Sequence, residues 1–557
     1  MIKEKKILKT VFVLAICCSS IFVCLGYSQC DQMPPKTDFN VEVLEFDAKG
    51  NAFDIDVDYR LRVYWVERTG AFKMHDQTTK ITKTIHKFET NWENGNYERF
   101  NEGGMQGMVL DPDFKNNHWV YFYYSVPLSE VEAHEATQLA PIERIIRATL
   151  TNDDMDLDES TIKTIHEHKI FAQCCHHGGD LEFDGEGNFW FSTGDNQNPA
   201  FTNDAPHNDT AAYRDARATA GNTNDWRGKV HRVRLINFPD SVTPAPGVGN
   251  TFEIPAGNLF DESKDLENKT LPSIYTMGHR NPFSISIHPI KGWLAEGEYS
   301  GAQGEDENNV FTGPGNAGWP YFSGYNISYA GTNHDPANLV NNSPFNTGLA
   351  YLPDAIPATL APNSTPIKQS MICGGHVGPW YVYDPYLDSK VKFPPYFNDK
   401  LFVTSEGAVP LDLAGFNEKG ELISLEQILA ANRLWESPFR LALGPDGALY
   451  MAVGQNTMVE TAPNSKIMKI GYKGTCSEIL SIPKKNKMKV TAGFSPVLLA
   501  NYNSNISFSF PNGAKMVKAY NMKGHLVWES RNPWGMKRYK MRMPDIIEKG
   551  IIQLRFF

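Results

Sequence analysis

The chain has 557 residues, 41% of them hydrophobic and 12% aromatic, which is typical of a globular protein with a sizeable core. Its formal net charge of −11 is unevenly distributed: residues 476–557 hold 14 Lys and Arg against 4 Asp and Glu, and residues 1–28 are net +3, which leaves −24 on residues 29–475. A body this acidic repels phosphate, so its composition argues against nucleic acid as a partner.

The first 28 residues have the pattern of a secretory signal. Four lysines within the first nine residues precede the apolar run VFVLAICCSSIFVCLG, and small residues follow up to Ser28. A membrane anchor would need about 20 unbroken apolar residues, and this run is shorter and is interrupted by Cys and Ser. No later segment is long and apolar enough to span a bilayer. We therefore expect cleavage after Ser28 and a secreted, periplasmic or cell-surface protein without an integral membrane segment.

The body repeats one plan: a strand, a turn rich in Asp, Gly, Pro or Asn, and a second strand rich in aromatic or β-branched residues. The copies are MVLDPDFKNNHWVYFYYS (108–125), LEFDGEGNFWFSTGD (181–195), SISIHPIKGWLAEGE (284–298) and LALGPDGALYMAVG (441–454), with a related form in LRVYWVERTG (61–70). Helical periodicity is confined to residues 128–150 and 422–436. Irregular copies separated by loops predict an all-β fold, a β-propeller with long insertions on one face. Two stacked β-sandwiches would give similar hairpins and are the alternative.

The basic carboxyl-terminal part differs from the body. The stretch SIPKKNKMK (481–489) has the composition of a charged linker, and short alternating strands are predicted at 505–510, 516–530 and 551–557. We predict four parts, listed in chain order: a signal peptide (1–28), a β-propeller (29–475), a basic linker (476–489) and a small C-terminal β-sandwich (490–557).

Two cysteines and two histidines, Cys174 to His177, stand directly before one of the predicted hairpins. Five cysteines follow the signal, an odd number, so at least one is a free thiol or pairs with another molecule. Adjacent cysteines in an exported protein favour a vicinal disulfide, which would stiffen the loop that presents His176. The alternative is a soft metal bound by the thiols together with the histidines.

Six motifs in register resemble those of the glucose/sorbosone dehydrogenase family, which includes the soluble quinoprotein glucose dehydrogenases. They are EGGMQGMVLDPDFKNNHWVYFYYS (102–125), HHGGDLEFDGEGNFWFSTGD (176–195), WRGKVHRV (226–233), PSIYTMGHRNPFSISIHP (272–289), GNAGWPYFSGYN (315–326) and SPFRLALGPDGALYMAVG (437–454). The resemblance covers about residues 50 to 472. It implies a six-bladed β-propeller that oxidises a sugar with pyrroloquinoline quinone (PQQ) and calcium and passes the electrons to an external acceptor.

The resemblance also implies roles for particular residues. His176 matches the family's catalytic histidine, and an imidazole can take a hydroxyl proton because it titrates near neutrality. PQQ carries three carboxylates, which call for cations. Arg280 and Asn281 match the family's cofactor-contacting pair, and Lys229 belongs to the matched RGK turn. The alternatives are a metal-ligating or structural histidine at 176 and an arginine at 280 that pairs with a nearby acid; His177 is expected to orient a partner or to face solvent.

A calcium site is implied by one further segment. EGEYSGAQGEDENNVF (296–311) matches the family segment whose backbone carbonyls hold the cofactor's Ca²⁺, with Tyr299, Ser300 and Gly301 nearest the contact. Oxygen-rich loops suit a hard cation of this kind. Tyr299 is expected to contact the cofactor, and Ser300 and Gly301 to hold the metal.

Some positions depart from the family pattern. Glu102 stands where the family has a cofactor-contacting glutamine, Asp384 stands where the dehydrogenase has a lysine, and LFVTSEGAVPLDLAGF (401–416) lacks the expected arginine pair. Added negative charge would weaken the binding of an anionic cofactor. Two hypotheses therefore stand: a secreted PQQ- and Ca²⁺-dependent dehydrogenase of an aldose or related sugar, and a non-catalytic propeller that binds glycan or protein.

The tail has a resemblance of its own. A YNMKGHLVWES hairpin followed by a terminal KGIIQLRF strand is similar to the C-terminal sorting domains of type IX secretion. A carbohydrate-binding or spacer module is the alternative.

Overall fold

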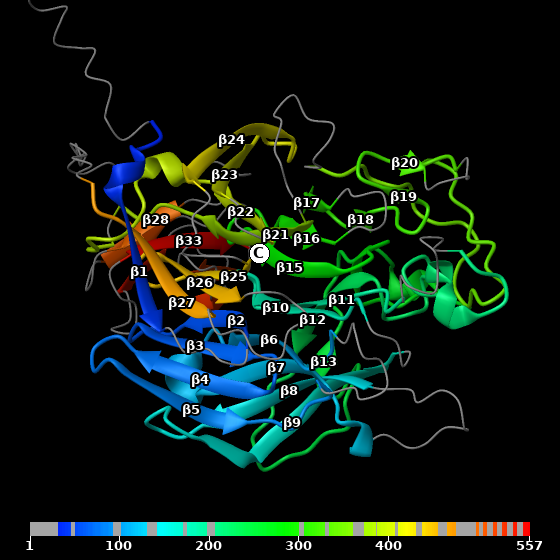
Figure 1. Cartoon of the computed structure of the whole chain (residues 1–557). Helices are drawn as coiled ribbons and strands as arrows, with labels where there is room; N and C mark the ends of the chain where they lie inside the picture. The colour runs from blue at the N-terminus through cyan, green and yellow to red at the C-terminus, as the bar shows by residue number, and fades with distance from the viewer. Residues whose placement is uncertain are drawn as a thin grey trace, which may run out of the picture.

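The structure is a computed structural model (Figure 1). It describes residues 32–45, 51–92, 102–130, 142–170, 175–197, 207–299, 306–328, 334–359, 373–385, 387–406, 410–430, 437–454 and 465–474, and the backbone of six strands between 497 and 556. Its helices are short: α2 (Phe114–Asn117) and the 3-10 helices η1 (Lys36–Asp38), η2 (Leu128–Glu130), η3 (Ala212–Arg214), η4 (Ala216–Ala218), η5 (Glu262–Lys264) and η6 (Pro395–Phe397). None of these described helices has the length and hydropathy of a membrane span.

The first three blades are antiparallel sheets in chain order. The first contains β2 (Ala52–Val57), β3 (Arg62–Glu67), β4 (Ala71–Asp76) and β5 (Ile81–Lys87). The second contains β6 (Met105–Leu110), β7 (Trp119–Ser125), β8 (Ile142–Leu150) and β9 (Leu157–Lys169). The third contains β10 (Gly178–Phe183), β11 (Phe189–Thr193), β12 (Lys229–Leu235) and β14 (Ile274–Met277), extended by β13 (Phe252–Glu253) and by the parallel strand β18 (Gly315–Asn316).

The remaining blades close the ring. The fourth contains β15 (Pro282–Ile287), β16 (Leu294–Glu298) and β17 (Glu307–Phe311). The fifth contains β21 (Cys373–Tyr381), β22 (Lys400–Glu406), β23 (Leu411–Phe416) and β24 (Leu422–Leu429). The sixth contains β25 (Ser437–Leu443), β26 (Leu449–Gly454), β27 (Lys466–Tyr472) and, as its outermost strand, β1 (Phe39–Glu45) from the start of the chain, which lies along β27 in Figure 1.

The six inner strands follow one another around a central axis. Each contacts the inner strand of the next blade, and the sequence of contacts returns to its start: β2, β6, β10, β15, β21, β25 and β2 again. This is the predicted all-β, six-bladed propeller. The four hairpin repeats in the sequence are the two innermost strands of the second, third, fourth and sixth blades, each of which starts at the axis.

A separate hydrophobic cluster fills each of the six interfaces between these blades. Because neighbouring blades cover both faces of an inner strand, β6 and β15 are buried along their whole length. The outer strand β5 is largely exposed and consists mainly of polar residues. Burial on both faces thus explains why the inner strands were the easiest to see in the sequence.

Polar side chains tie neighbouring inner strands together. The Oδ2 atoms of Asp54 and Asp56 on β2 accept hydrogen bonds from the backbone N–H groups of Met108 and Leu110 on β6, at 2.7 and 3.1 Å. Asp180 Oδ2 on β10 accepts from Ile285 N on β15 at 2.6 Å. These bonds satisfy buried amides that face the gap between two sheets.

The described parts of the two stretches with helical periodicity are mainly strands. Residues 142–150 are the strand β8 and residues 422–429 are the strand β24, each paired within its blade. Tertiary pairing overrides the local period, because a strand next to an existing sheet can satisfy its backbone there.

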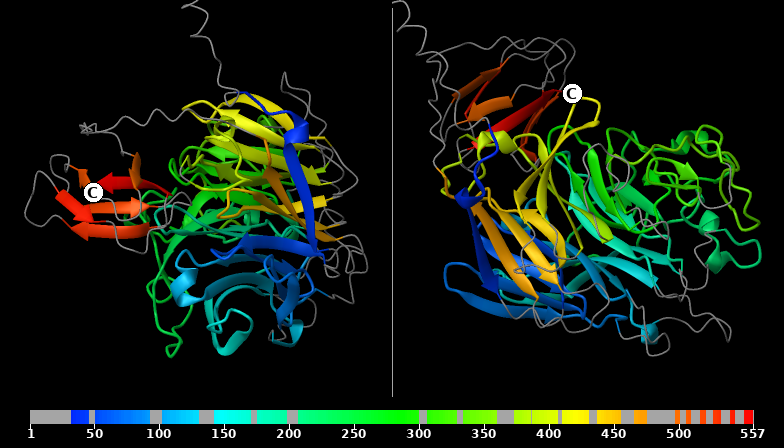
Figure 2. Two further views of the ribbon diagram at one scale, coloured as in Figure 1. Left: turned by 90° about the vertical axis from the view of Figure 1, so that its left-hand side faces the viewer. Right: turned by 45° about the horizontal axis from the view of Figure 1, so that its top comes forward.

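Long insertions build a lobe on one side of the ring, at the right of Figure 1 and of the right-hand view in Figure 2. Residues 207–228 and 315–359 pack together in it, and the lobe includes β19 (Phe322–Ser323) and β20 (Ile327–Ser328). Asn341 Nδ2 donates to the carbonyls of Arg217 and Gly221, at 2.8 Å each. The lobe carries Trp319, which becomes part of the site below.

The carboxyl-terminal strands form two further sheets. One contains β28 (Val497–Ala500), β33 (Gly550–Phe556), β30 (Met516–Tyr520) and β31 (Leu526–Arg531), and the other pairs β29 (Asn505–Phe508) with β32 (Tyr539–Arg542). The predicted linker lies outside the described residues, and the sandwich, the sorting role and the domain boundaries stay predictions.

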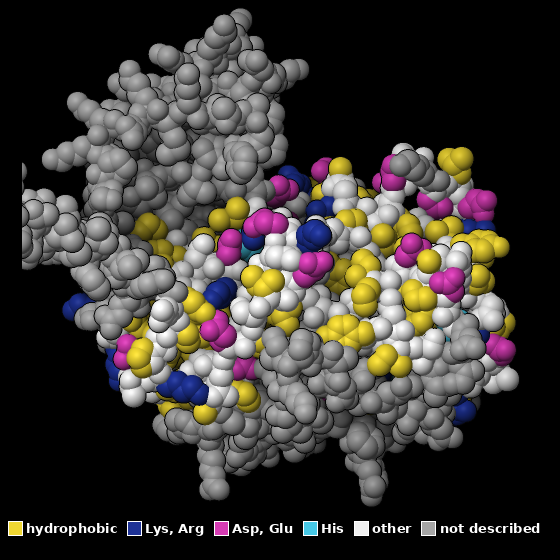
Figure 3. Space-filling model, turned by 90° about the horizontal axis from the view of Figure 1, so that it is seen from above, with side chains coloured by type: hydrophobic (Ala, Val, Ile, Leu, Met, Phe, Trp, Pro, Cys, Tyr) yellow, Lys and Arg dark blue, Asp and Glu magenta, His cyan; other side chains and the backbone are white. Residues whose placement is uncertain are grey.

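The face of the molecule shown in Figure 3 has a mixed surface. Acidic, basic and apolar side chains of the described residues are interspersed there, without a continuous basic region.

Closure of the ring should depend on the anchoring of β1. The ring of Phe39, 6% exposed, lies 6.0 Å from Phe393, 6.0 Å from Phe397 and 5.8 Å from Tyr472, between centroids. We expect Phe39→Ala to lower the free energy of unfolding by about 3–5 kcal/mol, measured by urea denaturation, because it leaves a cavity at the closing strand. Asn40→Ala on the exposed side of β1 is the control, and an equal loss there would contradict this interpretation.

Candidate active site

The predicted site residues that the structure describes lie at one end of the ring. All six inner strands start at this end, and the residues just before β6, β10 and β15 are Glu102, His176 and Arg280 with Asn281. Two hydrogen bonds join the third and fourth blades here. Asp195 N donates to Arg280 O at 2.7 Å, and Gly178 N donates to Asn281 Oδ1 at 3.0 Å. His176 and Arg280, far apart in the sequence, thus belong to one site.

His176 has a tightly held backbone. Its φ of 62° is in the left-handed region, its N–H donates to Glu102 Oε2 at 2.6 Å, and its carbonyl accepts from Asn196 N at 3.2 Å. A Cβ at position 194 would lie 2.0 Å from the His176 carbonyl oxygen, so only glycine fits at Gly194. The preceding residue, Cys175, is disulfide-bonded. Cys174 lies outside the described residues, so the vicinal bond stays a prediction.

Asp195 orients the imidazole of His176, a role that the sequence analysis missed. Asp195 Oδ1 lies 2.6 Å from His176 Nδ1 and also accepts from Gln197 N at 2.9 Å, while Oδ2 accepts from Trp319 Nε1 at 2.8 Å. The carboxylate, 0% exposed, therefore holds the proton of His176 on Nδ1 and leaves Nε2 as an acceptor. Among the described residues, His176 Nε2 has no hydrogen-bond partner. The sequence does place Asp195 at the end of the hairpin that follows His176, and in the structure the two strands of this hairpin pair Gly178 with Thr193.

His177 points away from this array. Its Nδ1 lies 2.6 Å from Glu143 Oε1, which also accepts from Ser125 Oγ at 2.8 Å. Burial opposes the protonated imidazole, but the Glu143 carboxylate outweighs it and raises the pKa of His177 above its ordinary value. His177 therefore pairs with Glu143 of the second blade, and the contact with a partner is one of the two roles expected for it.

Arg280 and Asn281 serve the scaffold and the site together. Arg280 N donates to Glu298 Oε1, its Nη1 donates to the Tyr299 carbonyl at 3.0 Å, and its Cζ lies 5.9 Å from the Trp319 ring centroid. The side chain is partly exposed, whereas Asn281 is 5% exposed and uses its amide oxygen for Gly178 N. The Arg280 guanidinium is thus the cation that the structure places beside His176 and Trp319.

Lys229 is enclosed and holds a loop. Its Nζ donates to the carbonyls of Thr219, Ala220 and Arg227 at 2.9, 3.1 and 2.7 Å, and the residue is 0% exposed. Burial lowers the pKa of Lys229 to about 7. These three bonds secure the turn before β12, and a contact of Lys229 with the cofactor stays a prediction.

The other predicted contacts have mixed outcomes. The Glu102 carboxylate accepts a hydrogen bond from His176 N, so Glu102 positions the loop that carries His176. Tyr299 OH lies 3.3 Å from His376 Nε2, and the Tyr299 carbonyl accepts from Arg280. Ser300 and Gly301 lie outside the described residues, and their role stays a prediction.

A floor closes the site end of the axis. Phe53, Phe283 and Phe439 pack together with ring centroids 5.1–6.2 Å apart. Arg440 is stacked on this group, with Cζ 4.2 Å from the Phe283 centroid and Nε 3.3 Å from Asp180 Oδ1.

The axis also contains buried carboxylates beside Arg440. Asp54 lies 4.0 Å from Arg440 Nε, and burial, with repulsion from Asp180, raises the pKa of Asp54 well above its ordinary value. Arg440 therefore pairs with acids inside the axis, and its Nη1 donates to the Phe439 carbonyl at 3.1 Å.

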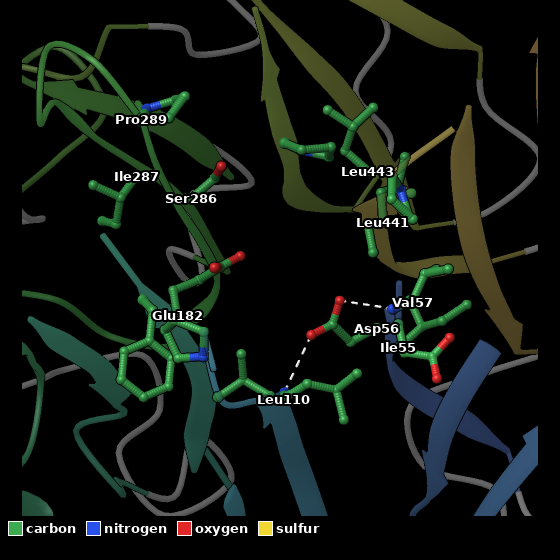
Figure 4. A pocket seen from close by; sticks show the side chains of 18 of the residues that line it. Ile55, Asp56, Val57, Leu110, Glu182, Ser286, Ile287, Pro289, Leu441 and Leu443 are labelled. Carbon is green, nitrogen blue, oxygen red and sulfur yellow. Dashed lines mark hydrogen bonds between the residues drawn. The ribbon is translucent and has the colours of Figure 1, made fainter. Parts of the chain in front are cut away.

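A cavity of about 450 Å³ opens at the opposite end of the axis (Figure 4). It is lined by the last residues of the inner strands, among them Val57, Leu110, Ile287 and Leu443. Asp384 belongs to this lining, so its negative charge is at the far end from His176. The expected repulsion between Asp384 and a cofactor at the site is thus not supported by the geometry.

The ion pair of His177 should give stability a particular pH dependence. Because the folded pKa lies above the ordinary 6.5, the pair stabilises fully below that value and loses its effect as the pH rises through the folded pKa. We expect the difference in unfolding free energy between wild type and His177→Gln to shrink from about pH 6 to about pH 9, measured by urea denaturation. His86→Gln is the control, since burial lowers the pKa of His86 and its effect must not shrink in this way.

Comparisons with known proteins place this geometry in a family. The family model described as Glucose / Sorbosone dehydrogenase matches residues 57–358. Quinoprotein glucose dehydrogenase B of Acinetobacter calcoaceticus is 26% identical over 243 residues, which cover 42% of this chain and 44% of that protein. Aldose sugar dehydrogenase YliI of Escherichia coli is 25% identical over 264 residues, or 45% of this chain and 58% of that protein. The chain thus spans about half the length of these curated relatives.

Solved structures agree on the fold. A glucose dehydrogenase crystal structure has a TM-score of 0.52 and 20% identity, covering 78% of this chain and 99% of that one. The apo form of the soluble aldose sugar dehydrogenase from Escherichia coli has a TM-score of 0.52 and 19% identity over the same shares. With the family model matching more than half of its residues, the chain belongs to the glucose/sorbosone dehydrogenase family.

Proposed function

We propose that this protein is a PQQ- and calcium-dependent dehydrogenase that oxidises an aldose or a related sugar, with His176 as the base. The observation that carries the proposal is the buried array of Trp319, Asp195 and His176 beside the Arg280 guanidinium. Export and an external electron acceptor belong to the same proposal, since residues 1–28 predict secretion.

The residues present fit the cofactor in part. Arg280 offers a partly exposed guanidinium to a carboxylate, and Trp319 offers an aromatic face beside it. Calcium rests on the family resemblance of residues 299–301, of which the structure describes only Tyr299. When bound, PQQ would supply the acceptor for the hydride that leaves the sugar carbon.

His176 would do the proton chemistry. When Nδ1–H donates to Asp195, Nε2 is the acceptor nitrogen of the ring and can take the proton of the sugar hydroxyl. The imidazolium that forms is stabilised by the Asp195 carboxylate, which Trp319 Nε1 and Gln197 N hold in place. The Phe53, Phe283 and Phe439 cluster gives the site an apolar floor on the side of the axis.

A catalytically silent propeller is the second candidate. The Glu102 carboxylate supports it, because it adds negative charge close to the backbone of His176. The two proposals differ in the affinity for an anionic cofactor that each one predicts.

Reconstitution tests the proposal. Purified protein is mixed with PQQ and Ca²⁺, the absorption spectrum of PQQ is recorded, and dye reduction is followed with a panel of aldoses. We expect a spectral shift and sugar-dependent reduction in the wild type. If both signals are absent at high micromolar PQQ, the dehydrogenase proposal is overturned and the silent propeller is favoured.

Two variants assign the base and its orienting group. His176→Ala should abolish turnover but keep the PQQ shift, and Asp195→Asn should lower kcat by about 10²–10⁴-fold because it removes the partner that sets the imidazole tautomer. His86→Ala on the outer strand β5 is the matched control and should keep full activity. A His176→Ala enzyme with wild-type kcat would remove the histidine from the mechanism.

A further inference from the structure

A second group of ligand-type side chains lies inside the fourth blade, beneath the proposed site. His279 directly precedes Arg280, and Glu296 and Glu298 are on β16. The two glutamates are two residues apart on a strand, so they share one face of the sheet. The register of β16 and β17 places Asn309 opposite Glu296 and Glu307 opposite Glu298 on that face. His279, Glu296 and Glu298 are each 0% exposed.

The spacing of these atoms matches a metal coordination sphere. His279 Nδ1 lies 3.0 Å from Glu298 Oε2 and 3.8 Å from Glu296 Oε2, and one ligand atom of each residue lies within 4.8 Å of the others. An ion with bonds of about 2.0–2.2 Å has ligand-to-ligand edges of about 3.3–3.6 Å in a tetrahedron and about 2.8–3.1 Å in an octahedron. The three side chains could therefore close on one ion with small rotations.

Among the residues that the structure describes, no lysine or arginine side chain forms an ion pair with Glu296 or Glu298. Independently, Glu296 Oε1 is fully buried and has no hydrogen-bond partner. A buried carboxylate oxygen without a donor points to a group that the coordinates do not contain, either a cation or a proton.

The surroundings hold each ligand as a metal site requires. His279 Nε2 lies 2.9 Å from Thr276 Oγ1, so the ring can donate there and present the Nδ1 lone pair inward. Asn309 Nδ2 donates to Glu296 Oε2 at 3.0 Å, and Arg280 N donates to Glu298 Oε1. Each of the three side chains is thus oriented by a neighbour, and one of these neighbours is the backbone of Arg280.

We propose that His279, Glu296 and Glu298 bind a divalent first-row metal ion of the zinc or manganese class inside the fourth blade. One imidazole nitrogen and two carboxylates suit these ions better than calcium, which prefers oxygen ligands alone. The site differs from the calcium expected on the backbone carbonyls of residues 299–301. The ion would position Arg280 by fixing Glu298, and it does not depend on PQQ or on turnover.

Metal content and thermal stability test this site without any activity assay. The full chain is stripped with a chelator and dialysed, and Zn²⁺ and Ca²⁺ are titrated separately by calorimetry, with bound metal counted by mass spectrometry. We expect one equivalent of Zn²⁺, a higher Tm with Zn²⁺, and no comparable rise with Ca²⁺. Wild-type protein that takes up no Zn²⁺ and keeps the same Tm would overturn the proposal and leave a proton shared by the two glutamates.

Variants locate the ion. Glu296→Gln keeps the shape of the side chain and should weaken Zn²⁺ binding by at least about 100-fold, while the metal-free Tm stays near that of the metal-free wild type. Glu159→Gln is the matched control, because Glu159 Oε1 lies 3.7 Å from His86 Nδ1 in a more exposed pair of the same chemistry. One equivalent of Zn²⁺ retained in both Glu296→Gln and Glu298→Gln would place the ion elsewhere and contradict the assignment.

Discussion

The closure of six sheets into a ring is the constraint on which the rest of this structure depends. The strand β1 completes the blade that β25, β26 and β27 begin, so the two ends of the propeller hold each other. A hydrophobic cluster at every blade interface and the carboxylates of Asp54, Asp56 and Asp180 on neighbouring amides keep the inner strands at a fixed spacing. A ring of this kind leaves few free sheet edges and makes each blade depend on both neighbours.

Because the inner strands all start at the same end, the ring also decides where the chemistry lies. The segments that lead into β6, β10 and β15 bring Glu102, His176 and Arg280 to the same end of the ring, although these residues are separated by up to 178 positions in the chain. The role of each buried acid then depends on the side chains and backbone groups that it contacts. Asp195 accepts from an imidazole, an indole and a backbone N–H, whereas Asp180 accepts from an amide and pairs with Arg440 below the phenylalanine floor.

Much of the fold was predictable, for a physical reason. Inner strands are covered on both faces, so hairpins such as 181–195 and 441–454 carry apolar and aromatic runs with sharp turns that are visible without coordinates. The strands β8 and β24 were not recognised in the sequence, because pairing within a blade satisfies the backbone of a strand whatever the local period of its side chains. The packing of Trp319 against Ala216 and Ala220 was not visible either, since these contacts join segments that are far apart in the sequence.

At the site, the sequence by itself determined which residue types are present: an imidazole after two cysteines, an arginine before Asn281, and an acidic strand at 296–298. Only the tertiary structure decided what each one does. It placed Asp195 behind His176, enclosed the Lys229 ammonium among three carbonyls, and moved Asp384 to the far end of the axis. The physical reason is that a side chain's charge and proton depend on its partners and its burial, and the packing of different blades sets both.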